Sequence, residues 1–176
     1  AWSWWGARDA EPCAAGLRMV NILFGDTYMN ERGPRSRLQG KVAIVTGAGS
    51  RGDGVGNGKA TAVLFAREGA KVVLVDMDLE AANETLAMIE AELGTGVASS
   101  FQADVTIDDD CKVLVDFTMD QYGRLDILDN NVGNSFRKTV VDIEPDEWDE
   151  YMTLNLKSMM LTSKHAIPRM IESGGG

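Results

Sequence analysis

From residue 41 to the end of the chain, short apolar runs alternate with longer segments of helical periodicity. Runs rich in Val, Ile and Leu are typical of strands buried on both faces, whereas apolar residues recurring every three or four positions are typical of helices. Strands that alternate with helices in this way predict a parallel sheet covered on both faces. The expected strands are 42–46, 71–76, 96–104 and 125–129, and the expected helices are one ending at Gly69, then 79–93, 107–122 and 145–171.

The first 39 residues lack this pattern and contain three of the four Trp residues. Without sustained periodicity we expect a poorly ordered extension over 1–39, followed by one domain over 40–176. The chain does not begin with Met, and Met29 opens a polar lead-in to the first strand. This favours the hypothesis that residues 1–28 lie upstream of the natural start, with a genuine N-terminal arm as the alternative.

A glycine-rich stretch between the first expected strand and helix is the strongest chemical signal. Glycine lets the backbone approach a pyrophosphate, and a helix N-terminus offers unpaired N–H groups and the positive end of the helix dipole. Its position after a strand favours dinucleotide binding over a merely flexible turn. The candidate cofactor-binding residues here are Thr46, Gly47, Gly49, Ser50, Gly56, Asn57 and Gly58.

Asp76 ends the second expected strand, 20 residues after Gly56. This is near the spacing of a carboxylate that accepts hydrogen bonds from the adenosine ribose hydroxyls. A carboxylate there would repel a 2′-phosphate, so NAD is favoured over NADP as the cofactor. Arg51 and Lys59 are nearby cations that could meet a phosphate instead. A helix N-cap is the alternative role for Asp76.

Several short motifs occur in the order in which the short-chain dehydrogenase/reductase family has them. They are Thr46-Gly47, Gly56-Asn57-Gly58 before Lys59-Ala60, Asp104-Val105 and Asn130-Asn131-Val132-Gly133. Over roughly residues 40–176 the chain therefore resembles this family. The resemblance implies a Rossmann-like, doubly wound α/β/α fold whose four strands lie in the order third, second, first, fourth.

The resemblance also assigns roles to the later motifs. Asp104 and Val105 would border the adenine ring, and Asn131, Val132 and Gly133 would line the cofactor cleft. The carboxyl ends of the strands are where cofactor sites of open α/β sheets are expected. A plain turn that ends the fourth strand is the alternative for the last of these motifs.

The glycine loop departs from the family pattern T-G-x-x-x-G-x-G. Gly47 and Gly56 are nine positions apart instead of four, so about five residues are inserted. The insertion leaves open which glycines contact the pyrophosphate. It also argues against the extended, sugar-nucleotide branch of the family, whose loop has a different glycine spacing.

Asn155 lies inside the last expected helix, where Asn is a poor helix former that bonds to nearby backbone. The resemblance implies that Asn155 belongs to the catalytic tetrad and holds a water in a proton relay; the alternative is a helix Asn packed on the sheet. The family's catalytic Ser and Tyr-x-x-x-Lys come on later elements. Neither Tyr28, Tyr122 nor Tyr151 has a Lys four positions later. We therefore expect the fold to be incomplete after the fourth strand and its helix, and the chain by itself to be inactive.

The activity that the resemblance implies is hydride transfer between a nicotinamide cofactor and a small-molecule alcohol or ketone. A non-catalytic dinucleotide-binding module is the competing hypothesis. The resemblance further implies a homo-oligomer in the full-length form, in which an apolar stripe on the last helix packs against a second subunit.

Composition narrows the partners and the compartment. Seventeen Lys and Arg against 27 Asp and Glu give a net charge of −10, which disfavours nucleic acid. No apolar run reaches the roughly 18 residues of a membrane helix. Cys13 and Cys111 are far apart and His165 is the single His, so we expect no metal site and a reduced, cytoplasmic compartment. We expect His165 on a helix surface without a partner.

Overall fold

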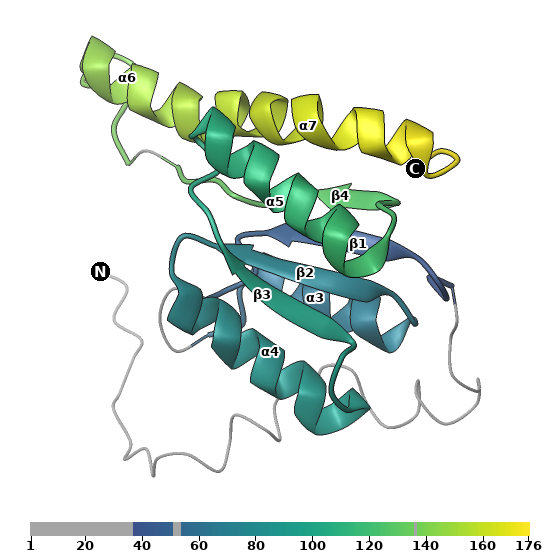
Figure 1. The fold of residues 1–176 in the computed structure, drawn as a ribbon. Helices are drawn as coiled ribbons and strands as arrows, with labels where there is room; N and C mark the ends of the chain where they lie inside the picture. The colour runs from purple at the N-terminus through teal and green to yellow at the C-terminus, as the bar shows by residue number, and fades with distance from the viewer. Residues whose placement is uncertain (1–36, 51–53, 136) are drawn as a thin grey trace, which may run out of the picture. The chain divides into compact units, whose positions relative to one another are not determined.

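Four parallel strands form one sheet in the order β3-β2-β1-β4, which confirms the expected order. This computed structural model describes residues 37–50, 54–135 and 137–176 (Figure 1). Most of the expected N-terminal extension, with Met29, Tyr28 and Cys13, lies outside the described residues. The strands are β1 Val42–Thr46, β2 Lys71–Asp76, β3 Ala98–Gln102 and β4 Ile127–Asp129.

Helices cover both faces of the sheet, as a doubly wound fold requires (Figure 1). One face carries α3 Asn57–Arg67 and α4 Leu79–Leu93, and the other carries α5 Asp108–Tyr122 and α7 Ser158–Glu172. The core is correspondingly divided into two buried apolar clusters, one on each side of the sheet. Among the described helices, none is both long and apolar enough to cross a bilayer.

The central strands β1 and β2 have apolar residues on both faces because each face is covered by helices. Side chains alternate along a strand, so Ile44 and Val73 enter the cluster beneath α5 and α7. Val45 and Leu74 enter the cluster beneath α3 and α4. All four are fully buried, which explains the unbroken Val, Ile and Leu runs of these strands.

The third and fourth strands are shorter than predicted. The expected strand 96–104 is wrong at both ends: Gly96 has a positive φ of 78°, and pairing stops at Gln102 because its partner Asp76 is the last residue of β2. The expected strand 125–129 begins instead at Ile127. Leu125 donates its N–H to the Ser173 hydroxyl, 3.1 Å away, so it bonds to the end of α7 rather than to a strand.

The last expected helix is not regular. It consists of α6 Pro145–Met152, a π-helical turn η1 Thr153–Lys157, and α7. Ser158 donates its N–H to the carbonyl of Thr153, five residues earlier, where an α-helix would bond four residues back. The prediction of one continuous α-helix from 145 to 171 is therefore wrong at the position of Asn155, the residue singled out for catalysis.

Candidate dinucleotide site

The carboxyl ends of β1 and β4 are joined by one hydroxyl group. Thr46 donates its Oγ1–H to the carbonyl of Asp129 at 3.1 Å and accepts hydrogen bonds from the N–H groups of Asn131 (3.0 Å) and Val132 (3.4 Å). Thr46 itself is buried, with 1% of its surface exposed. Thr46 therefore shapes the turn after β4 rather than presenting its side chain to a ligand.

The first turn of α3 packs directly on the end of β1, and only glycine permits this. A Cβ at Gly58 would lie 2.0 Å from the carbonyl oxygen of Gly47, far inside van der Waals contact. Gly47 has a positive φ of 64°, and its carbonyl accepts a hydrogen bond from the Asn131 side chain at 3.4 Å. The backbone N-terminus of α3 is thereby brought to the strand ends, where the sequence predicts a pyrophosphate.

Asp76 is fixed between the glycine loop and the start of α4. Its Oδ2 accepts the N–H of Gly49 at 3.0 Å, and its Oδ1 accepts the N–H of Asp78 at 3.1 Å. The alternative role of helix N-cap is wrong, because Asp78 caps α4 by accepting the N–H groups of Glu80 and Ala81. Each carboxylate oxygen of Asp76 keeps capacity for a further hydrogen bond, as ribose hydroxyls would need.

Arg51 and Lys59 are the two cations that could pair with the 2′-phosphate of NADP. Arg51 lies outside the described residues. Lys59 is buried, and its Nζ lies 3.6 Å from Oε2 of Glu84 on α4. The charge of Lys59 is thus already opposed by a carboxylate, which reduces the argument for a bound 2′-phosphate.

The motif after β3 is held by local hydrogen bonds. Asp104 accepts the N–H of Thr106 at 2.9 Å and its hydroxyl at 2.7 Å. Val105 is 5% exposed and packs in the core beside Cys111, whose thiol donates to the Val105 carbonyl at 3.3 Å. Burial and nearby carboxylates raise the pKa of Cys111 to about 11. Any contact of Val105 with an adenine would therefore involve its backbone.

The side-chain amide of Asn155 binds the loop that follows Gly133. Its Oδ1 accepts the N–H of Asn134 and its Nδ2 donates to the carbonyl of the same residue, both at 2.8 Å. A Cβ at Gly133 would lie 2.8 Å from that Oδ1, so a larger residue there would displace the Asn155 side chain. Asn155 positions this loop through its side chain, which leaves its backbone for any bond to a water.

Two contacts in this region were missed by sequence reasoning. Asn130 accepts a hydrogen bond from the hydroxyl of Thr162 on α7 at 2.6 Å, which connects the turn after β4 to this helix.

His165 was expected to have no partner, and this is wrong: its Nε2 lies 2.8 Å from Oδ1 of Asp108. Hydrogen bonds from Lys164 and then His165 lower the pKa of Asp108. No group of His, Cys, Asp and Glu suited to a metal ion occurs among the described residues.

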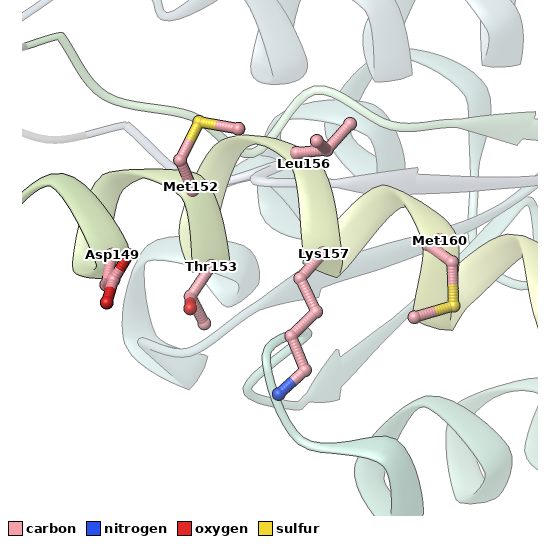
Figure 2. A pocket seen from close by; sticks show the side chains of 6 residues that line it. All are labelled: Asp149, Met152, Thr153, Leu156, Lys157 and Met160. Atoms are coloured by element: carbon pink, nitrogen blue, oxygen red, sulfur yellow. The ribbon is translucent and has the colours of Figure 1, made fainter.

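The expected apolar stripe on the last helical stretch is present. Leu156 and Met160 are 58% and 52% exposed, and Ile167 and Ile171 continue the stripe with 52% and 70%. A hollow of about 540 Å³ lies on this stretch, with side chains from successive turns around it (Figure 2). It is lined by Asp149, Met152, Thr153, Leu156, Lys157 and Met160.

Parallel strands in the order β3-β2-β1-β4, with a glycine loop after β1 and an acidic residue ending β2, define a Rossmann-like α/β protein. A sequence model of the short chain dehydrogenase family matches residues 41–176, and the chain belongs to this family.

Individual relatives agree with this assignment. Tropinone reductase-like 1 of Erythroxylum coca is 40% identical over 148 residues, which cover 82% of this chain and 51% of that protein. The 3-oxoacyl-[acyl-carrier-protein] reductase FabG of Thermotoga maritima is 36% identical, over 80% of this chain and 54% of its own. A crystal structure of hydroxysteroid dehydrogenase from Escherichia coli is 34% identical with a TM-score of 0.72, over 82% and 58% of the two chains. The chain spans about half the length of the curated relatives it matches.

Proposed function

We propose that residues 40–176 form the nucleotide-binding part of an oxidoreductase that transfers a hydride between NAD and an alcohol or ketone. The observation that carries the proposal is the carboxylate of Asp76, held at the strand ends by the N–H of Gly49 beside the close contact of Gly47 with Gly58. Family membership supports the reaction class. The relatives named above, a 3-oxoacyl-[acyl-carrier-protein] reductase and a tropinone reductase-like protein, support a carbonyl or alcohol substrate.

The described residues fit such a nucleotide. A Cβ at Gly58 would collide with the carbonyl oxygen of Gly47, so no side chain fits between strand and helix there, which is the close backbone approach that a pyrophosphate requires. The N–H groups at the start of α3 would hold the pyrophosphate, and Asp76 would hold the adenosine ribose. When bound, the nicotinamide supplies or accepts the hydride.

Asn155 would act on the reaction indirectly. By holding both backbone groups of Asn134, it fixes the loop that continues from Gly133 at the mouth of the site. π-Helical turns such as η1 are frequent at functional sites, because the extra residue redirects side chains and frees backbone groups. A backbone carbonyl in this turn is the candidate acceptor for a hydrogen bond from the water of the proton relay.

The acid–base group of the reaction would be a Tyr whose pKa is lowered by a Lys four residues later, as the family resemblance implies. No Tyr in the 176 residues has this Lys, so we expect turnover only from a longer polypeptide. We further propose a cytoplasmic homo-oligomer in which the stripe through Leu156 and Met160 meets a second subunit.

The cofactor preference is tested by calorimetric titration of the chain with NAD and NADP. Repulsion of a 2′-phosphate by Asp76, even at about 1.4 kcal/mol, makes NAD bind about tenfold more tightly. Asp76→Asn should remove most of this difference, whereas Glu80→Gln, which neutralises an exposed carboxylate on α4, should keep it. Equal affinities in the unaltered chain would contradict the role of Asp76.

The non-catalytic alternative is decided by a different measurement. A longer version that supplies the family's Ser and Tyr-x-x-x-Lys after residue 176 is assayed for NAD reduction with a panel of alcohols, beside the 176-residue chain. Turnover by the extended version alone supports the enzyme. Tight NAD binding by both without turnover by either would favour a dinucleotide-binding module.

A further inference from the structure

The glycine loop of this chain contains an insertion, and the described residues show where the insertion leaves and rejoins the loop. Ser50 Oγ accepts the N–H of Gly56 at 2.9 Å, although the two residues are six positions apart. A Cβ on Gly56 would lie 3.4 Å from the same Oγ and 3.6 Å from the carbonyl oxygen of Gly49. The backbone at Gly56 has therefore returned to the point that it left at Ser50.

Both sides of this junction are anchored without the intervening residues. On one side, Ala48 donates its N–H to the carbonyl of Val75 at 3.0 Å and accepts the Thr85 hydroxyl at 2.8 Å. On the other side, α3 begins at once, because Ala60 donates its N–H to the carbonyl of Gly56 at 3.0 Å. The two sides of the junction are therefore fixed by β2, α4 and the first turn of α3.

We propose that the Ser50–Gly56 hydrogen bond closes the nucleotide loop across the insertion, and that Ser50 is a positioning residue for this loop. This inference rests on the proposed nucleotide site. Omitting 51–55 leaves Thr46-Gly-Ala-Gly-Ser50 followed by Gly56-Asn-Gly58, which has the family's T-G-x-x-x-G-x-G spacing. Gly47, Gly56 and Gly58 are then the three glycines of the functional loop, and Gly52 and Gly54 belong to the insertion.

The role of Ser50 follows from the length of the insertion. In a loop of the usual length, a peptide bond would join the residues at these two positions. Here the Ser50 hydroxyl holds Gly56, the N-cap residue of α3, in place through a hydrogen bond instead. The Ser50–Gly56 hydrogen bond is exposed to solvent, so losing it should cost no more than a weak hydrogen bond does. We expect this loss to weaken NAD binding about threefold. If residues 51–55 are deleted, the peptide bond replaces the hydroxyl and Ser50 becomes dispensable.

The experiment is a double-mutant cycle measured by NAD titration of the folded chain. Deletion of 51–55 should change the dissociation constant by less than about twofold. Ser50→Ala should weaken binding about threefold in the full chain, Ser50→Thr should not, and Ser50→Ala should change it by less than about 1.5-fold in the deletion background. Amide hydrogen exchange at Gly56 should accelerate about threefold in Ser50→Ala alone, which reports on the loop without any nucleotide.

Two results would overturn the inference. If the deleted chain keeps its thermal unfolding temperature but loses NAD affinity more than about tenfold, residues 51–55 form part of the nucleotide site. An equal loss from Ser50→Ala in both backgrounds would show that the hydroxyl contacts the nucleotide itself. If the unaltered chain does not bind NAD, the proposed function fails, and Gly56 exchange in Ser50→Ala still decides whether the Ser50 hydroxyl holds the N–H of Gly56. The same exchange measurement decides the matter if the deletion prevents folding.

Discussion

A buried carboxylate at the amino end of the sheet should contribute measurably to stability. The side chain of Asp126 is 1% exposed, and its oxygens accept hydrogen bonds from the Val42 N–H at 2.9 Å, Lys41 Nζ at 3.0 Å and the Arg124 guanidinium. These bonds connect the segment before β4 with the start of β1. Asp126→Asn keeps the size of the side chain but removes its charge, and so tests this cluster with little change in packing.

The magnitude follows from the pKa of Asp126. Burial by itself raises this pKa, but hydrogen bonds from Arg124, the Val42 amide and Lys41 outweigh burial and lower it to about 2. The difference between this pKa and that of an Asp in the unfolded chain corresponds to about 2.5 kcal/mol in the free energy of unfolding. Because the folded pKa is the lower one, this contribution is complete above about pH 5 and is lost progressively as the pH falls through about 4 and then 2.

The assay is urea unfolding followed by circular dichroism at pH 7 and at pH 3. Asp126→Asn should lower the free energy of unfolding by about 2.5 kcal/mol at pH 7, and by less at pH 3. The matched control is Asp116→Asn, since Asp116 is a half-buried carboxylate near the surface, paired with Lys112 and Arg169, and it should change stability by no more than about 0.5 kcal/mol. A loss at Asp126 that is as small as at Asp116, or that does not shrink with falling pH, would refute the reasoning.

Three other substitutions have specific expected outcomes. Gly58→Ala forces a Cβ to within 2.0 Å of a carbonyl oxygen, so it should cost about 2 kcal/mol in thermal unfolding and abolish NAD binding, whereas Gly54→Ala, in open space, should do neither. Asn155→Ala should accelerate amide exchange at Asn134, whose N–H it now binds; unchanged exchange would show that the loop holds itself. Leu156→Glu should reduce self-association in analytical ultracentrifugation, and equal association would place the subunit contact elsewhere.

Sequence patterns located the elements whose limits are set by local chemistry. The limits of β1, β2 and α4 agree with prediction, because β-branched runs define the strands and Gly94, with a positive φ of 85°, ends the helix. The third strand was predicted too long because its length depends on where its partner β2 ends. An edge strand such as β3, with Ser99 and Ser100 in place of apolar residues, has limits that only pairing can supply.

The candidate site shows the same division between local and distant causes. Sequence motifs were enough to predict which residue types form the site, because the glycine loop around Gly47 and the carboxylate of Asp76 have characteristic positions and spacing. What each side chain does depends on partners that are remote along the chain: Asn155 binds Asn134, 21 positions away, and Asp76 binds Gly49, 27 positions away. The π-helical turn belongs to this second group, because its extra residue alters no propensity or period strongly enough to be noticed in the sequence. An Asn in a helical pattern therefore indicates that some backbone needs a partner, and only the fold identifies which backbone it is.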